Sequence, residues 1–379
     1  MAFASISTDL YLPAMPAIAA DLHADVGRIE FTISAYLIGF SLGQLFWGPM
    51  SDQYGRRMPI VAGIILFILG SAGCAMANSV DAIIFFRIVQ ALGACANVVL
   101  SRAIVRDLYV GNDAARMLST LMTVMAVAPL IGPSLGGAIL HFGNWRNIFE
   151  VLVVIGSLTL FAMKNFPETL KQEQRNIQSF REILGTYWDL LKNKKFMQFA
   201  LVSGAFYGGM FAYIAGTPFA YITYFHVSPQ VYGILFASGI IGVMLANQLN
   251  SKLVGKFGVS NLIFTGSILA TVAGVLMILT TTSGFGGLYG LAVCLFIFVS
   301  CTGLIVANSI AGALSCTQGN AGSASALIGT FQYGTGILGS GLVGLFANAT
   351  LWPLVLVVST SALVTLFWAI QIRKLNINS

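Results

Sequence analysis

Residues 48–57 read Gly48-Pro-Met-Ser-Asp52-Gln-Tyr-Gly55-Arg56-Arg57 and join two long apolar runs. Each run has about the 20 residues that a helix needs to cross a bilayer. Gly48 and Gly55 permit a tight turn between two packed helices. Asp52 precedes Arg56 by one helical turn and is expected to accept a hydrogen bond from its guanidinium. The stretch therefore predicts a short polar turn between two membrane spans.

The composition excludes a soluble protein. Of the 379 residues, 57% are apolar and only 8% are charged, whereas a soluble domain carries about 25% charged residues. These proportions also exclude a disordered chain and a fibrous protein, and they leave a polytopic membrane protein. The five cysteines form no CxxC pair and the three histidines lack the spacing of metal ligands, so we expect no metal site and no cofactor. The sequence contains no Walker A loop, so any pumping must draw on an ion gradient.

Twelve apolar runs are long enough to span a membrane. A polar stretch, 165–195, separates six runs in residues 1–164 from six in residues 196–379, and it contains an amphipathic segment around 179–191 that favours a short surface helix. The sequence thus predicts an all-α membrane protein with two six-helix halves and a cytoplasmic linker. The predicted spans are 1–20, 31–50, 58–77, 82–103, 118–141, 147–164, 196–224, 231–249, 262–282, 285–310, 323–346 and 351–372.

The basic residues indicate the orientation of these spans. If the N-terminus lies in the cytoplasm, all but three of the 19 Lys and Arg fall on the cytoplasmic side. Arg28 and Arg146 lie outside, and Arg87 lies within a span. This bias follows the positive-inside rule and predicts cytoplasmic N- and C-termini. The excess of Lys and Arg in cytoplasmic loops then explains the formal net charge of +6, and we expect no nucleic-acid partner.

A weak internal repeat supports two similar halves. Residues 48–55 lie between the second and third predicted spans, and residues 251–258, Ser-Lys-Leu-Val-Gly-Lys-Phe-Gly, lie between the eighth and ninth. Two six-span halves in parallel repeat are typical of a transporter of the major-facilitator type, in which a small-molecule substrate crosses the bilayer.

The stretch 48–57 resembles the loop signature of the major facilitator superfamily, GxLxDRxGRR, and departs from it at Gln53. Besides Asp52, the Arg56 guanidinium can reach Asp107 at the cytoplasmic end of the fourth span. A charge cluster at a rocking interface is a bistable element, so we expect a gate that holds the cytoplasmic side shut, with a fixed structural clamp as the alternative. The residues assigned to this gate are Gly48, Asp52, Gly55, Arg56, Arg57 and Asp107.

Two further segments resemble motifs of the same superfamily. Arg87-Ile-Val-Gln90-Ala-Leu-Gly93 resembles RxxQG. An arginine inside a span needs a carboxylate, a water-filled cavity or carbonyl partners, unless it lies near enough to the outer end to snorkel. Residues 128–137, APLIGPSLGG, resemble GPxxGG, which in this superfamily accompanies antiporters, and close helix packing alone is the alternative. The resemblance assigns Pro129, Gly132, Pro133, Gly136 and Gly137 to that antiporter motif.

The opening segment narrows the resemblance. Residues 8–16, TDLYLPAMP, together with these motifs, resemble the bicyclomycin-resistance (Bcr/CflA) subfamily of drug:proton antiporters over essentially the whole chain. The resemblance implies a proton-coupled exporter of small amphipathic antibiotics in the inner membrane, and we expect a monomer. Only eight residues precede Asp9, fewer than is usual in that subfamily. Either helix 1 is shortened or the native start lies upstream of Met1.

The carboxylates restrict where protons can bind. Residues 196–379 contain no Asp or Glu, so all 13 lie in the first 195 residues. Asp9 and Glu150 fall within predicted spans, where a low dielectric favours the protonated form of a carboxyl. Asp9 is the first candidate for the proton carrier, with Arg87 as an available partner, and a static ion pair or a helix cap beside Pro13 is the alternative. Glu150 is the second candidate. Asp21, Asp25, Glu30 and Asp81 are expected outside the membrane.

Aromatic and amide side chains supply a wall for an amphipathic substrate, although each of them can equally be packing. Because the second half lacks acids, this wall suits neutral or zwitterionic compounds better than dications. An alternative cargo is a metabolite such as an amino acid, a sugar or a nucleoside. An intramembrane enzyme is disfavoured because no nucleophile–base pair occurs at membrane depth. The candidates for substrate contact are Tyr11, Tyr36 and Gln90 in the first half and Tyr207, Phe211, Tyr213, Tyr221, Phe331, Gln332 and Tyr333 in the second.

Overall fold

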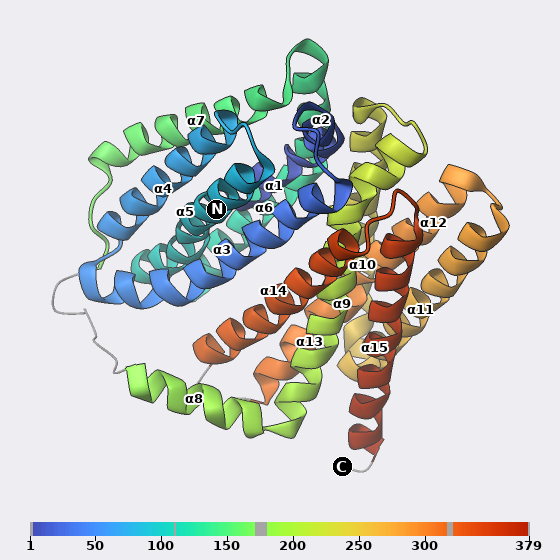
Figure 1. The fold of residues 1–379 in the computed structure, drawn as a ribbon. Helices are drawn as coiled ribbons and strands as arrows, with labels where there is room; N and C mark the ends of the chain where they lie inside the picture. Colours follow the sequence, from blue (N-terminus) through green and yellow to red (C-terminus); the bar gives the residue numbers. More distant parts are fainter. Residues whose placement is uncertain (1–2, 110, 171–179, 317–320, 378–379) are drawn as a thin grey trace. The chain divides into compact units, whose positions relative to one another are not determined.

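The computed structural model describes residues 3–109, 111–170, 180–316 and 321–377, and within these ranges every regular element is a helix (Figure 1). The prediction of an all-α protein is therefore confirmed. Up to residue 165 the elements are α1 (Phe3–Asp9), the 3-10 turn η1 (Leu12–Ala14), α2 (Met15–Asp21), α3 (Val26–Tyr54), α4 (Arg57–Ala75), α5 (Val80–Leu108), α6 (Gly111–Phe142), α7 (Trp145–Ala162) and η2 (Met163–Asn165). From residue 180 they are α8 (Phe180–Lys192), α9 (Lys194–Pro218), the π-helical turn η4 (Phe219–Tyr224), α10 (Pro229–Phe257), α11 (Val259–Ser283), α12 (Gly287–Ser300), α13 (Thr302–Ser315), α14 (Ala321–Leu345) and α15 (Trp352–Ile377).

Each of the twelve predicted spans overlaps one or more of these helices. In the described part of the chain, nine helices are long and apolar enough to cross a membrane, and a further apolar stretch, Val127–Phe142, is shorter. The first predicted span, 1–20, is divided into α1, η1 and α2, and the tenth is divided at Cys301 into α12 and α13. The amphipathic segment predicted around 179–191 forms α8.

Glycines with a left-handed backbone follow α3 and α10. Gly55 ends α3 with a φ of 90°, and Gly258 follows α10 with a φ of 77°. A side chain is strained at such a φ, so glycine lets the chain turn sharply into the next helix. The two turns occupy the same place in each half, as the sequence repeat predicts. Gly48 lies inside α3, and a Cβ there would meet nothing within 4 Å, so the expectation that it shapes the turn is wrong.

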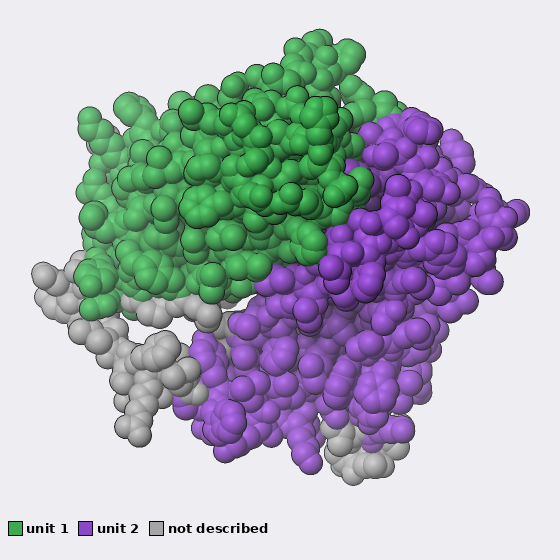
Figure 2. All heavy atoms as spheres, in the orientation of Figure 1, with its two compact units in different colours: residues 1–178, 228–234 green, residues 179–227, 235–379 purple. Residues whose placement is uncertain are grey.

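The chain divides into two compact units (Figure 2). Unit 1 contains residues 1–178 and 228–234, and unit 2 contains residues 179–227 and 235–379. Within unit 1, α3 and α4 both pack along α5, and within unit 2, α14 and α15 both pack along α9. The predicted linker at 165–195 stays a prediction, because part of it lies outside the described residues.

Small residues let α3 approach α5 closely. A Cβ on Gly43 would lie 2.8 Å from the Cβ of Cys95, and one on Gly39 would clash with the backbone carbonyl of Ile88. Close approach of this kind is what holds helices together in lipid, where the hydrophobic effect between helices is absent. It also brings polar residues of α3 and α5, among them Tyr36 and Arg87, into contact.

Candidate functional site

The first predicted span is interrupted beside Asp9, and we call its three elements, α1, η1 and α2, helix 1. α1 ends at Asp9, η1 follows at Leu12–Ala14, and α2 starts at Met15. Pro13 carries no N–H for the carbonyl of Asp9, four residues earlier, so a continuous α-helix loses a hydrogen bond here. Irregular backbone at membrane depth is tolerated only where protein buries it or where it lines a cavity. The Asp9 side chain is 6% exposed, so the break is covered by protein.

Arg87 lies on α5 between two tyrosine rings, and it is 0% exposed. Its guanidinium carbon is 4.5 Å from the ring centroid of Tyr11 and 4.2 Å from that of Tyr36. Its Nη1 donates to the carbonyl of Ser7 at 3.0 Å and to Oε1 of Gln90 at 2.7 Å. A desolvated cation–π contact is worth about 2 kcal/mol, so the two rings offset part of the cost of burying this charge. We call Ser7, Tyr11, Tyr36, Arg87 and Gln90 the arginine cage.

Further hydrogen bonds hold the members of the cage in place. The members come from helix 1, α3 and α5, and the bond of Gln90 to Ser71 connects the cage to α4 as well. Tyr11, Tyr36 and Gln90, which the sequence predicts as substrate contacts, are brought together here and all contact Arg87. The bonds are Tyr36–Ser7 at 2.7 Å, Tyr11–Thr32 at 2.6 Å and Gln90–Ser71 at 2.8 Å.

Asp9 and Arg87 both keep unused polar atoms. Oδ2 of Asp9 and both Nε and Nη2 of Arg87 are buried without a hydrogen-bond partner. Among the described residues no ion pair joins the two side chains, so Arg87 is not the direct partner predicted for Asp9. The alternative that Arg87 snorkels is also wrong, because its side chain is buried. A buried polar atom without a partner costs about 1–3 kcal/mol, and such a cost at one place indicates a functional site.

Two glycines of α6 let that helix pack closely against the interrupted part of helix 1. A Cβ on Gly132 would lie 2.6 Å from the Cβ of Asp9, and one on Gly136 would clash with the carbonyl of Leu10. Any larger side chain at either position would therefore push α6 away from helix 1. Two residues of the predicted antiporter motif thus contact the segment that carries the buried carboxylate.

The other residues of this motif lie on the same helix. A Cβ on Gly137 would be 2.8 Å from the carbonyl oxygen of Pro229. Pro229 starts α10 and belongs to unit 1, whereas α10 from Leu235 onward belongs to unit 2. Pro129 and Pro133 lie inside α6, which stays helical through both. Close packing, the alternative interpretation of the motif, is therefore present, and an antiport role stays a prediction.

Glu30, which the sequence places outside the membrane, is a buried carboxylate. It is 3% exposed on α3, and its Oε2 has no hydrogen-bond partner. Glu150 is instead exposed near the start of α7, where Nδ2 of Asn147 donates to it at 2.9 Å. A signal for Glu30 existed in the sequence, because helical spacing puts it on one face of α3 with Ser34 and Ser41.

Arg56 connects three segments at the α3–α4 turn. Its Nη1 donates to Oδ1 of Asp52 at 2.6 Å and to Oγ of Ser51 at 2.8 Å, and its Nε donates to Oδ2 of Asp107 at 2.8 Å. Hydrogen bonds between charged groups are roughly twice as strong as neutral ones. Both contacts predicted for Arg56 are thus present, and their role as a gate stays a prediction.

Glu168 takes part in the same cluster, which the sequence does not predict. Its carboxylate accepts from the backbone N–H of Arg56 at 2.7 Å, of Arg57 at 3.1 Å and of Leu170 at 3.0 Å. Partial burial raises the pKa of Glu168, but the backbone hydrogen bonds outweigh it and hold the pKa below its usual value. Arg57 also donates to the carbonyl of Lys164 at 2.8 Å. We call Asp52, Arg56, Asp107 and Glu168 the clasp.

Unit 2 holds an aromatic cluster. Tyr207 and Phe211 of α9 and Tyr333 of α14 have ring centroids 5.9, 6.0 and 6.4 Å apart, and all three are half-buried. Phe331, also half-buried, lies against Gly204. Three of the predicted wall residues therefore form one surface that combines apolar rings with phenol hydroxyls.

The remaining predicted contacts of unit 2 are packed in its interior. Tyr213 is buried and stacks on Phe236 with ring centroids 5.4 Å apart. Gln332 is buried, and its Nε2 donates to Oγ of Ser203 at 2.7 Å. Tyr221 is buried as well. These three side chains stabilise unit 2 in the arrangement described.

A family model described as the Major Facilitator Superfamily matches residues 1–340. The chain belongs to this superfamily. Among its superfamily relatives, it is 39% identical over 347 residues to the uncharacterized MFS-type transporter YdgK of Bacillus subtilis, which covers 90% of this chain and 85% of that protein. It is 30% identical over 373 residues to the bicyclomycin resistance protein homolog of Haemophilus influenzae, with 98% and 93% covered. Its fold is similar to a crystal structure of the nucleoside transporter NupG, with a TM-score of 0.79, 12% identity and 98% of each chain covered.

Membership of the Major Facilitator Superfamily confirms two predictions. The fold is that of a multi-pass membrane protein of this superfamily, and the resemblance to the bicyclomycin-resistance subfamily holds over nearly the whole chain. The chain is therefore a membrane transporter that carries small molecules, rather than an enzyme.

Proposed function

We propose that this transporter exports small amphipathic drugs in exchange for protons, as a monomer in the cytoplasmic membrane with both termini inside the cell. The observation that carries the proposal is Asp9, a buried carboxylate with an unpaired oxygen at the break in helix 1. The relative named for bicyclomycin resistance supports a drug as cargo. The positive-inside bias supports the orientation. The proton gradient supplies the driving force, so no cofactor is needed.

The proton step takes place at Asp9. In the described state its side chain packs on Gly132, and among the described residues no cation pairs with it. An uncompensated buried charge costs several kcal/mol, so this arrangement requires the neutral carboxylic acid. Loss of the proton then favours a different arrangement, in which the carboxylate gains water or a cation. Proton release and movement of helix 1 are thereby coupled.

Arg87 is the fixed positive charge of the site. It holds the carbonyl of Ser7, which stands two residues before Asp9, and its Nε and Nη2 have no acceptor. We propose that the drug binds in the arrangement that Asp9 adopts after it loses its proton, in which the oxygen acceptors of the drug reach these two donors, and that protonation of Asp9 restores the arrangement without drug. Drug binding and Asp9 protonation then exclude each other, which is the requirement for exchange of one against the other.

Glu30 is a second proton-binding group in this proposal. The arginines on the outer side of unit 1 are already paired, Arg28 with Asp81 and Arg146 with Asp21. An ionised Glu30 would therefore be a buried charge without a partner, which a low-dielectric site does not tolerate. A carboxyl in this position exchanges its proton when the surrounding helices open.

The clasp and the aromatic cluster complete the transport cycle. We propose that the clasp opens and closes the cytoplasmic side as the two halves rock in alternating access. Tyr207, Phe211 and Tyr333 supply the apolar wall against which a drug lies. Because residues 196–379 contain no Asp or Glu, neutral and zwitterionic drugs are the expected cargo.

Inverted membrane vesicles test this function directly. Respiration acidifies the lumen of such vesicles, and we expect labelled bicyclomycin to accumulate there and to raise the luminal pH as it enters. A protonophore should abolish both signals, and vesicles without the transporter should show neither. Drug accumulation that persists with the protonophore would reject proton coupling. Absence of drug flux together with export of a metabolite would reject the drug as cargo.

A further inference from the structure

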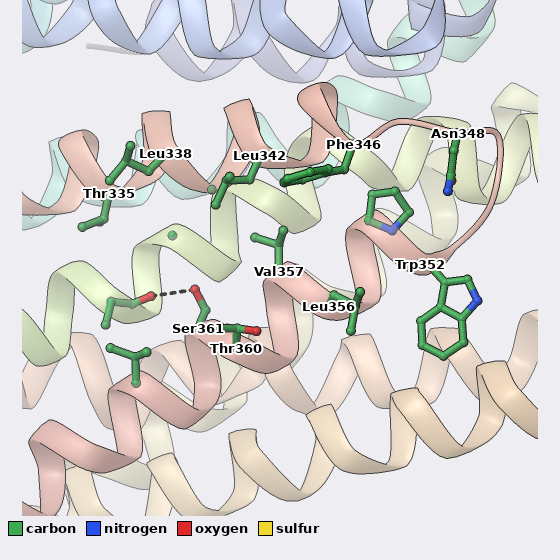
Figure 3. A pocket seen from close by; sticks show the side chains of 15 residues that line it. Thr335, Leu338, Leu342, Phe346, Asn348, Trp352, Leu356, Val357, Thr360 and Ser361 are labelled. Atoms are coloured by element: carbon green, nitrogen blue, oxygen red, sulfur yellow. Dashed lines mark hydrogen bonds between the residues drawn. The ribbon is translucent and has the colours of Figure 1, made fainter.

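A groove of about 560 Å³ opens in unit 2 between α9, α14 and α15 (Figure 3). Its lining comes from these three helices and from the loop that joins α14 to α15. The arginine cage and the clasp belong to unit 1, so the groove is a separate feature. Its volume lies in the range of about 300–1,000 Å³ in which proteins bind molecules of drug or lipid-chain size.

The groove exists because α14 and α15 both pack on α9 and contact each other much less. Gly208 of α9 and Gly339 of α14 meet backbone to backbone, so α14 lies deep on α9 at this point. The small residues let α14 pack closely on α9, and α15 diverges from α14. The groove is the space left between α14 and α15. Inside a membrane, either an apolar molecule fills such a groove or the side chains that line it lose van der Waals contacts.

The wall of the groove offers an occupant almost no polar partner. Oγ of Ser361 donates to the carbonyl of Ala205 at 3.0 Å, and Oγ1 of Thr335 donates to the carbonyl of Gly204 at 2.5 Å. Both hydroxyls are thereby used in bonds to α9. The exposed hydroxyl of Thr360 and the loop-end residues Asn348 and Trp352 are the other polar groups of the lining, and the rest is apolar, so the occupant must be apolar along most of its length.

Along α14 and just after it, the side chains at the rim of the groove are exposed. Leu338 is 64% exposed, Leu342 is 41% exposed and Phe346 is 60% exposed. Figure 3 shows Leu338 and Leu342 along α14 and Phe346 directly after it, with Val357 on α15 beside them. Exposed aliphatic and aromatic side chains on a spanning helix contact lipid tails. The groove is therefore open sideways to the bilayer.

The length and the polar end of the groove identify the occupant. From Thr335 to its end at Leu345, α14 rises about 15 Å, which is about half of the 30 Å hydrocarbon core, the depth of one leaflet. Asn348 and Trp352 lie together at the loop end of the groove (Figure 3). Their N–H groups can donate to the ester and phosphate oxygens of a lipid headgroup, and tryptophan is typical of the membrane–water interface.

We propose that this groove binds one acyl chain of a glycerophospholipid from the outer leaflet, with the headgroup at Asn348 and Trp352. The predicted topology puts the loop between α14 and α15 on the outer side. The bound chain fills the space between α14 and α15 and keeps them apart. None of the residues that the proposed function uses, in the arginine cage, the clasp or the aromatic cluster, lines this groove, so the inference goes beyond the proposed function.

Photo-crosslinking of the full-length protein in detergent tests the proposal. The probe is phosphatidylethanolamine with a diazirine in the middle of one chain, and the labelled residues are mapped by peptide mass spectrometry. We expect saturable labelling of residues 335–364. Val357→Phe, which fills the groove, should lower the labelling roughly tenfold, because it displaces about two methylenes of the chain. Leu363→Phe, on the exposed face of the same helix outside the groove, should label like wild type.

Three results would overturn the proposal. Equal labelling of Val357→Phe and Leu363→Phe, or labelling spread evenly over all exposed helices, would mean an ordinary lipid annulus. Displacement of the probe by bicyclomycin would mean a drug site. Thr360→Phe fills the same groove from an exposed position and replaces Val357→Phe if that variant does not fold. Asp9→Asn should label like wild type, which separates this result from failure of the transport proposal.

Discussion

The Arg87 guanidinium donates to the carbonyl oxygen of Ser7 at 3.0 Å, and this bond connects a buried charge on α5 to the short helix that carries Asp9. The rings of Tyr11 and Tyr36 lie against the guanidinium and restrict its position. Helix 1 therefore cannot move relative to α5 unless this bond breaks or the cage moves with it. A movement of the segment that carries Asp9 is therefore coupled to the position of Arg87.

Arg87→Lys should prevent coupled transport although the charge is kept. Lysine has no planar group to lie between Tyr11 and Tyr36, and it cannot donate to two acceptors in fixed directions. Loss of stacking and of one hydrogen bond, about 1 kcal/mol each, predicts a fall of at least tenfold in drug–proton exchange. Tyr36→Phe keeps the ring and loses the hydroxyl contacts with Ser7 and with the carbonyl of Ala4, so it should retain most of the activity. Wild-type exchange by Arg87→Lys in vesicles would contradict the role of the cage.

Gly132→Ala should lower both stability and transport. The added methyl would lie 2.6 Å from the Cβ of Asp9, so α6 must move away from helix 1. Overpacking of this kind costs about 1–3 kcal/mol, which a thermal unfolding scan in detergent can detect. Gly334→Ala is the matched control, because a Cβ on that α14 glycine meets nothing within 4 Å. Equal melting temperatures for the two variants would show that α6 does not depend on its close approach to Asp9.

Glu168 should hold the α3–α4 turn at every pH at which the transporter works. Because its pKa is lower in the folded chain than in the unfolded chain, its contribution is present above the unfolded value of about 4.3 and is lost only as the pH falls through the lower folded value. Hydrogen exchange of the Arg56 and Arg57 amides, corrected for intrinsic rates, should therefore be equally slow at about pH 6 and pH 8.

Glu168→Gln provides the comparison. The amide side chain keeps its size but accepts backbone hydrogen bonds less strongly than a carboxylate. The same two amides should then exchange faster, and by the same factor at both pH values. Protection in the wild type that weakens between about pH 8 and pH 6 would mean that Glu168 takes up a proton in that range and that its pKa is raised rather than lowered.

Glu30→Gln should reduce the number of protons exchanged for each drug. The amide imitates the neutral acid in size but cannot release a proton, so about one proton fewer should move in each cycle. The reversal potential of drug flux in proteoliposomes measures this ratio. Glu150→Gln is the control, since that carboxylate is exposed and should leave the ratio unchanged. An unchanged ratio in Glu30→Gln would remove Glu30 from the proton pathway.

The sequence predicts those parts of the site that local spacing determines. The turn at Gly55 and the contact of Arg56 with Asp52 depend on residues whose type restricts the backbone or the charge pairing nearby. The contact of Arg56 with Asp107 follows from the predicted spans, which put both residues at the same side of the membrane. The twelve apolar runs predict the helices for the same reason, because the thickness of the bilayer sets their length.

The parts that the sequence does not predict depend on tertiary contacts. Glu168 joins Arg56 across 112 positions, and no local pattern indicates that distance. Glu30 looks like an outer-surface residue because it stands near the end of a run, although α3 buries it. Gly48 follows the family signature but lies inside α3, because the helix continues to Tyr54 before the turn. The arginine cage needed three helices to come together before its members could be recognised as one group.

The central claim is that Asp9 carries the exchanged proton, and Asp9→Asn tests it most directly. The amide imitates the neutral acid and cannot ionise, so we expect drug binding to purified protein to be weaker than in wild type and to lose its dependence on pH. Drug-driven proton flux in inverted vesicles should disappear, because asparagine cannot release the proton whose loss moves helix 1, and Glu30 exchanges its proton only when the helices open. Weaker, pH-independent binding with no proton flux is the predicted result. Undiminished drug–proton exchange by Asp9→Asn would contradict the account and remove Asp9 from the mechanism.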